Sequence, residues 1–274
     1  MRPAPSPFHI GIVHYINSRP LSRGLQRGEP GGSFVCELLP PAVIADRLRD
    51  GSLDVGLVPS IEVARIPGLA VVPGIAIAAT HEVRSVLLVS QVPIGEIRSV
   101  ALDENSRTSA ALVRILLAER YGLEPEYRPA RADLEEMLAD SDAALLIGDP
   151  ALTVPRDRYV VLDLAGEWLE LTGLPFVFAV WAVREALPAG DLVATLTASL
   201  ATGLAELDAI VAETAAETGL APAVLADYYT RNLRFTMGPA EQAGLAEYLR
   251  RAAARGLAPA VRVRFLPAPA AAAG

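Results

Sequence analysis

Lysine is absent from this sequence of 274 residues, and all 24 of its basic side chains are arginines. Without a lysine amine the protein can form no Schiff base, hold no pyridoxal phosphate in the usual way and offer no Walker A lysine to a nucleotide. The 32 acidic residues leave a net charge of -8, and no basic tract is present that could bind a phosphate backbone. Nucleic acid is therefore not an expected partner, and any anionic ligand must be held by a local site.

Cysteine and histidine are also scarce. Cys36 is the single cysteine, which excludes an internal disulfide and a multi-cysteine metal site and is compatible with a reducing compartment. The three histidines, His9, His14 and His81, are too few and too scattered to indicate a metal centre. The sequence contains no G-x-S-x-G nucleophile elbow. We therefore expect no metal centre.

Long hydrophobic segments are missing as well. The longest stretch without a charged residue, residues 66–80, contains two prolines and two glycines and is shorter than the ~20 residues of a membrane helix. The N-terminal sequence MRPAPSPFHIGIV enters an apolar strand directly and lacks the apolar core of a secretory signal. These features predict a soluble, cytoplasmic protein without a membrane partner, and they leave the oligomeric state open.

What is present is a pattern of alternating strands and helices. With 52% hydrophobic residues, the chain can bury a sizeable core, and its length favours about two domains. Alternation of strand and helix predicts parallel sheets with a ligand crevice at the carboxyl ends of the strands. We expect strands at 9–13, 34–38, 55–58, 69–79, 83–90, 100–102, 143–147, 159–162 and 176–183, and a weak one near Tyr127. We expect a short helix that ends at residue 26, a helix that begins after Ser106, and further helices at 41–49, 134–138, 191–217, 223–229 and 241–254.

This order of elements predicts an α/β protein of two lobes joined by two crossings of the chain. We expect residues 1–86 and 182–274 to form one lobe and residues 87–181 to form the other. Ligand sites commonly lie where two such units meet. The predicted ligand cleft therefore lies between the lobes.

The segment VALDENSRTSAALVRILLAERYG, residues 100–122, is typical of a strand, a polar loop and a helix. Ser106, Arg107, Thr108 and Ser109 fall where the first N–H groups of the helix have no intrahelical acceptor. Such a junction favours an anion. The alternative is that Asn105 or Ser106 merely caps the helix, as asparagine and serine commonly do.

Six motifs in order make the sequence resemble a known family: HYINSRPL, VGLVPSIEVAR, VRSVLLVS, ALDENSRTSAALVRILL, LLIGDPAL and EWLELTGLPFVFAVWA. Together they are similar to the chorismate dehydratases of the futalosine route to menaquinone, a family with the periplasmic-binding-protein fold of type II. The likeness covers nearly the whole chain to about Ala182 and continues more weakly through YYTRNLRFTMGPAEQAGL. It implies loss of water from chorismate, a small dicarboxylate, to give 3-[(1-carboxyvinyl)oxy]benzoate, a reaction expected to need neither a metal nor an organic cofactor.

The resemblance also indicates residues of the site. Asn17 matches a Tyr-x-Asn loop of the family, and Ser85 interrupts an apolar run at the expected crossing, so both are predicted to be catalytic. Their alternatives are an ordinary turn residue and a serine that bonds to the backbone. The residues predicted to bind the substrate are Ser60, Ser106, Arg107, Thr108, Ser109 and Asp149, of which Ser60 and Asp149 could equally be helix caps.

No histidine, lysine or cysteine is credibly placed as a general base for such an elimination. One hypothesis is that the enolpyruvyl carboxylate of the substrate takes the proton while Asn17 and Ser85 donate hydrogen bonds, and another is that Asp149 is the base. A solute-binding protein for a small carboxylate is an alternative from a different class. The sister enzyme dihydroxynaphthoate synthase is another, but that family is expected to carry a histidine where this sequence reads Ile147-Gly148-Asp149.

Overall fold

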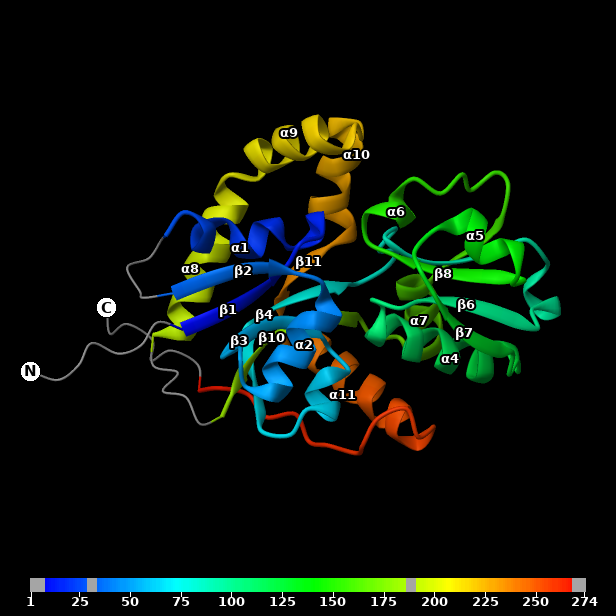
Figure 1. The fold of residues 1–274 in the computed structure, drawn as a ribbon, viewed down its shortest axis with the longest axis horizontal. Coiled ribbons are helices and arrows are strands. Elements are labelled where there is room, and N and C mark those ends of the chain that lie inside the picture. The colour runs from blue at the N-terminus through cyan, green and yellow to red at the C-terminus, as the bar shows by residue number, and fades with distance from the viewer. Residues whose placement is uncertain (1–7, 29–33, 186–190, 268–274) are drawn as a thin grey trace, which may run out of the picture.

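The computed structural model describes residues 8–28, 34–185 and 191–267, and it has two lobes, each built on one sheet (Figure 1). The strands of the first sheet lie in the order β11-β4-β10-β3-β1-β2, and those of the second in the order β7-β6-β8-β5-β9. The first sheet comprises β1 (Phe8–Val13), β2 (Phe34–Leu39), β3 (Val55–Pro59), β4 (Leu69–Ala79), β10 (Phe176–Arg184) and β11 (Arg234–Met237). The second sheet comprises β5 (Val86–Ser90), β6 (Ser99–Asp103), β7 (Glu126–Ala130), β8 (Ala143–Ile147) and β9 (Val160–Asp163).

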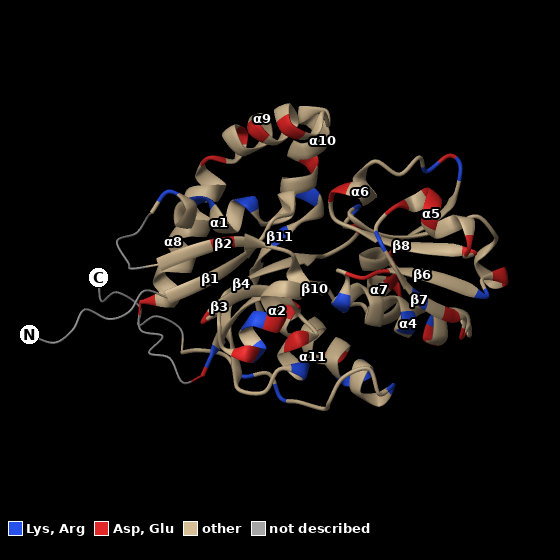
Figure 2. Cartoon of the chain, viewed as in Figure 1, with Lys and Arg blue, Asp and Glu red and all other residues tan. Residues whose placement is uncertain are grey.

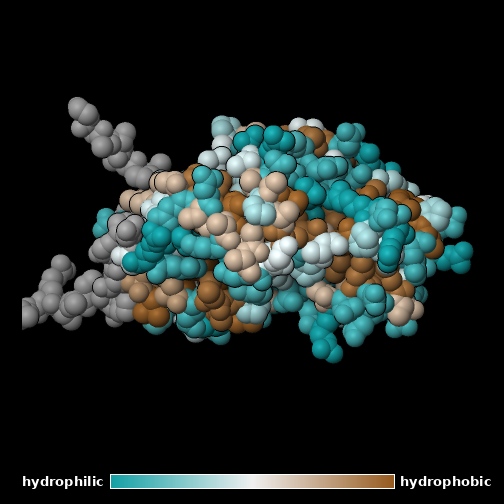
Figure 3. Space-filling view, turned by 90° about the horizontal axis from the view of Figure 1, so that it is seen from above, coloured by the Kyte–Doolittle hydropathy of each residue, from teal (hydrophilic) through white to brown (hydrophobic). Residues whose placement is uncertain are grey.

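The central strands are uncharged because both of their faces are covered. All residues of β3 and β5 are buried, as expected for near-continuous apolar strands between layers of helices. Figure 2 shows the charged residues gathered on helices, loops and outer strands. Figure 3 shows a face on which hydrophobic and hydrophilic residues are interspersed. The hydrophobic pattern therefore predicted most of these strands correctly.

Both sheets are mixed, whereas the alternation of strands and helices predicted parallel ones. In the first sheet β10 runs antiparallel to β3 and β4, and in the second β5 runs antiparallel to β8 and β9. Each of these two strands enters its sheet from the other lobe and so begins at the edge facing that lobe, where the neighbouring strands end. The direction of a strand thus depends on the crossing that precedes it, which the local pattern does not reveal.

The two crossings lie between β4 and β5 and between α7 (Leu164–Thr172) and β10. The second boundary, predicted between residues 181 and 182, falls inside β10. Because β10 pairs with β3 and β4 along its length, residues 176–181 lie in the first sheet. Val86 pairs with Ile147 in the second sheet, so the first predicted boundary is late by one residue.

The helices cover both sheets, and most begin and end where expected. Gly51, at a φ of 85°, follows the last residue of α2 (Pro41–Asp50), where glycine is favoured. The helices around the first sheet are η1 (Ile16–Ser18), α1 (Arg19–Gln26), α2 (Pro41–Asp50), α3 (Glu62–Arg65), α8 (Leu192–Ala205), α9 (Leu207–Thr218), α10 (Pro222–Asp227), η3 (Tyr228–Asn232) and α11 (Pro239–Ala254). The helices around the second sheet are η2 (Ile94–Glu96), α4 (Arg107–Tyr121), α5 (Leu134–Ala139), α6 (Asp149–Leu152) and α7.

The predicted helix at residues 191–217 is two helices, α8 and α9, bent by 73° at Glu206. The carboxylate of Glu206 accepts hydrogen bonds from Arg23 and Arg27 at the end of α1. Helix α8 lies very close to α1, since a Cβ on Gly203 would come within 1.9 Å of the Pro20 carbonyl oxygen. Among the described helices, none is by itself long and apolar enough to cross a membrane; α8 and α9 reach that length and composition only as this bent pair.

One hydrophobic cluster contains residues of both lobes, and a smaller one lies within the second lobe. Trp168 of α7, Phe176 of β10 and Tyr248 of α11 meet edge to face, with ring centroids 5.0 to 6.2 Å apart. Edge-to-face aromatic pairs add stability beyond the area they bury. This aromatic cluster therefore helps to join the two lobes.

Candidate functional site

A cleft opens between the lobes where the carboxyl ends of β1, β3, β4, β6 and β8 face one another. Its empty space, about 590 Å³, includes open solvent at the mouth of the cleft. The residues lining the cleft are Val13, Tyr15, Asn17, Pro41, Pro59, Ile77, Val83, Ser85, Val86, Asn105, Ser106, Arg107, Thr108, Ser109, Ile147, Gly148, Phe178, Ala179 and Leu233.

Asn17 lies in η1, the short turn that follows β1, and lines the cleft. Its amide oxygen Oδ1 is buried and has no hydrogen-bond partner among the described residues. Leaving a buried acceptor unpaired is costly, so native structures usually pair such groups with protein, water or ligand. This side chain is therefore available for a bound molecule.

Ser85 stands at the end of the first crossing and is almost fully buried. Its hydroxyl accepts a hydrogen bond of 2.8 Å from the Tyr228 hydroxyl, and its carbonyl oxygen accepts one from the Gly148 N–H. The preceding residue, Arg84, has a φ of 64°, a left-handed conformation that is unusual for a residue with a side chain. Such strain persists only where the surroundings enforce it.

Asp163 enforces the conformation before Ser85. Its carboxylate accepts from the N–H groups of Val83 at 3.0 Å and Arg84 at 2.6 Å, and it also caps α7. Burial raises the pKa of Asp163 while these backbone donors lower it. The crossing is thereby fastened to the second lobe, and the direction of the Ser85 side chain follows from it.

The N-terminus of α4 reaches the cleft with the residues predicted to bind an anion. Ser106 occupies the capping position, but its side chain makes no capping hydrogen bond, and its buried Oγ has no partner among the described residues. The first N–H groups of a helix have no intrahelical acceptor, and those of Thr108 and Ser109 have none elsewhere in the described parts of the chain. The capping alternative is thus not observed, and donors remain free at a positive helix end.

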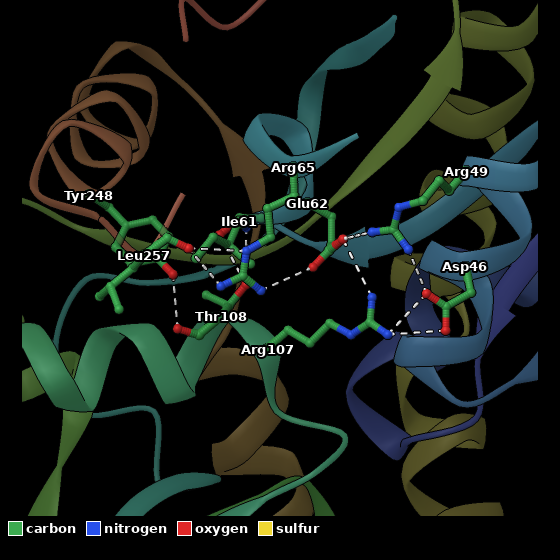
Figure 4. Close-up of polar contacts among 10 residues, drawn as sticks. Asp46, Arg49, Ile61, Glu62, Arg65, Arg107, Thr108, Tyr248 and Leu257 are labelled. Carbon is green, nitrogen blue, oxygen red and sulfur yellow. Dashed lines mark hydrogen bonds and ion pairs between the residues drawn. The ribbon is translucent and has the colours of Figure 1, made fainter. Parts of the chain in front are cut away.

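Thr108 connects the lobes. Its hydroxyl accepts a hydrogen bond of 3.2 Å from the Ile61 N–H and lies 3.5 Å from the Ser60 hydroxyl. Its carbonyl oxygen accepts from the Tyr248 hydroxyl at 2.9 Å. These contacts fix the first turn of α4 against the first lobe (Figure 4).

Arg107 lines the cleft, but its guanidinium group turns to carboxylates of the first lobe (Figure 4). It donates to both oxygens of Asp46 at 3.1 Å and lies 3.5 Å from Glu62. Arg49 and Arg65 also pair with Glu62, whose side chain is fully buried. The guanidinium group of Arg107 therefore already has carboxylate partners within the protein.

Two residues predicted to bind the substrate do not line the cleft. The Ser60 hydroxyl is fully buried and donates to the Val177 carbonyl oxygen at 2.7 Å, beneath Thr108. The Asp149 carboxylate accepts from the Ile16 N–H at 3.3 Å. Both side chains satisfy backbone groups near the cleft, and a direct contact of either with a ligand stays a prediction.

Two carboxylates lie behind the cleft beside Tyr15. Burial raises the pKa of Asp103 and that of Asp149, and backbone donors oppose each shift. Burial and these two nearby charges also raise the pKa of Tyr15. The Tyr15 ring approaches closely because Gly148 has no Cβ, which at that position would come within 3.0 Å of the ring.

The described lining contains one charged residue, Arg107, and no carboxylate, histidine or thiol. Among the residues that the structure describes, no three His, Cys, Asp or Glu side chains are grouped as a metal site would require. What the lining does offer is hydroxyl, amide and backbone N–H groups beside apolar walls. Such groups position and polarise a ligand.

Tyr228 and Asp163 are the contributors to this site that sequence reasoning missed. Neither lines the cleft, and both act on Ser85 or its neighbours from behind. Tyr228 lies in η3, a π-helical turn, and such turns are frequent at functional sites. The motif YYTRN contains no local sign of that turn, and only the fold brings it to Ser85.

Fold and site together define a two-lobed protein of the periplasmic-binding-protein class with a cleft for a small molecule. An Archaeoglobus fulgidus protein superposes with a TM-score of 0.75 at 15% identity, covering 91% of this chain and 97% of that one. The alkanesulfonate-binding protein of Xanthomonas axonopodis pv. citri, bound to MOPS, gives 0.67 at 19% identity, with 93% and 95% covered. A Candida albicans protein described as having the generic periplasmic binding protein fold gives 0.64 at 11% identity, with 94% and 92% covered. At these identities the likeness establishes the fold.

The sequence comparisons give the family. A sequence model of the menaquinone biosynthesis family matches residues 8–254, and the chain belongs to that family. The chorismate dehydratase of Thermus thermophilus is 32% identical over 258 residues, which cover 87% of this chain and 93% of the relative. The resemblance indicated by the six motifs is thereby confirmed.

Proposed function

We propose that this protein is a chorismate dehydratase, a carbon–oxygen lyase that removes water from chorismate to give 3-[(1-carboxyvinyl)oxy]benzoate. Membership of the menaquinone biosynthesis family and the Thermus thermophilus relative support this activity. The observation that carries it at the level of residues is the free N-terminus of α4 in the cleft, with the unpaired Ser106 hydroxyl beside it. A dicarboxylate needs such an anion site.

Elimination of water has three requirements. A base must take the proton from C3 of the ring, negative charge that develops in the ring must be stabilised, and the hydroxyl on C4 must leave with the electrons of its bond. The proton and the hydroxide together make the water that is lost, and no oxidant or reductant is consumed. The lining supplies donors for the second and third requirements.

The proton acceptor we propose is the enolpyruvyl carboxylate of the substrate itself. The described lining carries no carboxylate, histidine or thiol to compete for that role. Asp149, the alternative base, accepts from the Ile16 N–H outside the lining. The protein then positions the substrate so that its own carboxylate reaches C3, a gain that comes from orientation.

Asn17 and Ser85 serve in this scheme as the donors that act on the reacting ring. They lie on the crevice side of two different elements, η1 and the crossing, and can stabilise the ring carboxylate as charge builds or assist the departing hydroxyl. The first turn of α4 binds one carboxylate through its free N–H groups and through the hydroxyls of Thr108 and Ser109. Preorganised donors in a site with little water are worth more than the same donors in solution.

A solute-binding protein for a small carboxylate is the second candidate, because proteins of this fold include the alkanesulfonate-binding protein named above. The two functions make different predictions for one experiment. Purified protein is incubated with chorismate and the mixture is analysed by mass spectrometry. A product lighter by one water, formed in excess over the protein, supports the dehydratase; chorismate recovered intact from a tight complex supports the binding protein.

A further inference from the structure

Tyr228 lies directly behind Ser85 and outside the lining of the cleft. Its ring is almost fully buried in η3, and its hydroxyl donates a hydrogen bond of 2.8 Å to the Ser85 Oγ. No acceptor for the hydroxyl of Ser85 lies among the described residues. A molecule in the cleft therefore meets Ser85, and Tyr228 can influence it only through that serine or its neighbours.

The direction of this hydrogen bond determines what Ser85 can do. A phenol has one proton and a serine hydroxyl both donates and accepts. Because the proton of Tyr228 is directed at the Ser85 Oγ, the proton of Ser85 remains free to be donated into the cleft. Hydrogen bonds in a chain also strengthen one another when water is excluded.

Burial raises the pKa of Tyr228 by more than its polar neighbours Ser85 and Asn17 lower it. The phenol therefore keeps the proton that it donates to the Ser85 Oγ.

The turn that carries Tyr228 is fastened on both sides. The hydroxyl of Tyr229 donates to the Ile16 carbonyl oxygen at 3.0 Å, next to Asn17, and the amide of Asn232 donates to the Glu82 carbonyl oxygen at 2.9 Å, on the crossing that leads to Ser85. These two hydrogen bonds fix η3 relative to both donors. The position of the Tyr228 hydroxyl is therefore not adjustable.

We propose that Tyr228 is a positioning residue of the elimination, which holds the Ser85 hydroxyl as a donor directed into the cleft. This inference rests on the proposed function, because it needs Ser85 to act on the substrate. It adds a residue that binds no substrate and whose contribution depends on Ser85.

The test is a double-mutant cycle with Tyr228→Phe, Ser85→Ala and the double variant, measured as kcat and KM for chorismate. Tyr228→Phe removes one hydroxyl and keeps the ring, so we expect kcat to fall about three- to tenfold, the range of one neutral hydrogen bond, with KM within twofold. In the Ser85→Ala background the same substitution should have no further effect. Tyr121→Phe is the matched control, since its hydroxyl donates to Glu167 away from the cleft, and should leave kcat unchanged.

Each other outcome overturns a distinct statement. If Ser85→Ala lowers kcat and Tyr228→Phe does not, the positioning role is wrong and the proposed function stands. If Tyr228→Phe lowers kcat by the same factor with and without Ser85, it acts on the general structure and the inference is again wrong. If the wild-type protein does not convert chorismate, the proposed function and the inference fall together.

Discussion

Two polar regions meet between the lobes, and they differ in how completely their groups are paired. In the cleft, Asn17 Oδ1 and Ser106 Oγ are buried without partners among the described residues. Next to Ser106, Arg107 of α4 reaches a second region around Glu62 of α3, a buried carboxylate paired with Arg49, Arg65 and Arg107. The first region is incomplete until something binds, whereas the second is complete within the protein.

This difference separates ligand groups from structural groups better than charge does. A search for an anion site by charge would select the arginines around Glu62, yet protein carboxylates already neutralise them. A paired ion gains little from an added anion, while an unpaired donor or acceptor recovers its desolvation cost when a ligand arrives. The neutral groups of the cleft are therefore the better candidates for contact with the substrate.

The largest effect is expected in the cleft, at Asn17. Losing one preorganised donor costs about 10²- to 10³-fold in turnover, and Asn17→Asp should be worse than Asn17→Ala because it adds a negative charge beside a dianionic substrate. Steady-state kcat for both variants measures this. The opposite result is that only Asp149→Asn abolishes turnover while kcat of both Asn17 variants stays within a few-fold of the wild type. In that case Asp149 is the base, and the unpaired groups of the cleft are not the ones that matter most for turnover.

Glu62→Gln should mainly affect stability. Removing one partner of a buried ion pair leaves the others uncompensated, and we expect a loss of about 3 kcal/mol in the free energy of unfolding, measured by denaturant titration. Asp46→Asn is the matched control, since the Asp46 side chain is 55% exposed and should cost below about 1 kcal/mol. If Glu62→Gln instead unfolds normally and loses substrate binding, the region around Glu62 is part of the ligand site.

Thr108 belongs to both regions and should show both effects. Thr108→Ala removes the acceptor of the Ile61 N–H, which costs about 1 to 3 kcal/mol of stability. It should also weaken substrate binding more than tenfold, since a hydrogen bond to a charged group is worth about 1.5 to 3 kcal/mol. Calorimetry measures the binding. Thr108→Ser keeps the hydroxyl and should retain both the stability and the substrate affinity of the wild type. If Thr108→Ala binds the substrate as tightly as the wild type, the Thr108 hydroxyl does not contribute to the proposed anion site.

Arg107→Gln should have a smaller effect. The Arg107 and Asp46 side chains are partly exposed, so their pair contributes below about 1 kcal/mol and is weaker at high salt. KM should change by less than a few-fold. If KM rises tenfold or more at every salt concentration, the guanidinium group of Arg107 leaves Asp46 to bind a substrate carboxylate. The cleft and the region around Glu62 would then form a single ligand site.

The smallest effect is expected at Glu247 on α11, in another ion network between the lobes. Hydrogen bonds from Arg250 and Arg251 lower its pKa to about 2, and Arg251 also pairs with Glu119 of α4. Because the pKa of Glu247 is lower in the folded protein than in the unfolded chain, its charged carboxylate stabilises the fold at pH values above the unfolded pKa near 4.5. This contribution is lost as the pH falls toward 2. Glu247→Gln should therefore cost below about 1 kcal/mol at pH 7, and unfolding curves of variant and wild type should converge at acidic pH. A difference that persists at acidic pH assigns the effect to packing.

Local patterns in the sequence predicted much of the fold, because hydrophobic periodicity and end signals such as Gly51 depend on neighbouring residues. Together with the family resemblance, they indicated the cleft residues Asn17, Ser85 and Ser106 to Ser109, which lie at strand ends or at a crossing. They missed α7, the strand β11 and the bend at Glu206. The short strand β11 has only four residues, too few for a reliable periodic pattern.

The tertiary structure alone decided which polar groups are paired with other groups of the protein and which remain without a partner among the described residues. In the sequence Arg107 and Ser106 are equal candidates for an anion, and only the approach of α2 and α3 pairs Arg107 with Asp46 and Glu62. Ser60 likewise looks free until β10 is laid beside β3. Hydrogen bonds between residues far apart depend on how lobes and layers meet, so no local pattern contains them. The sequence by itself determined which chemical groups follow the strand ends and the crossing near the cleft; the packing of distant segments determined which of them line it and which remain unpaired for a substrate.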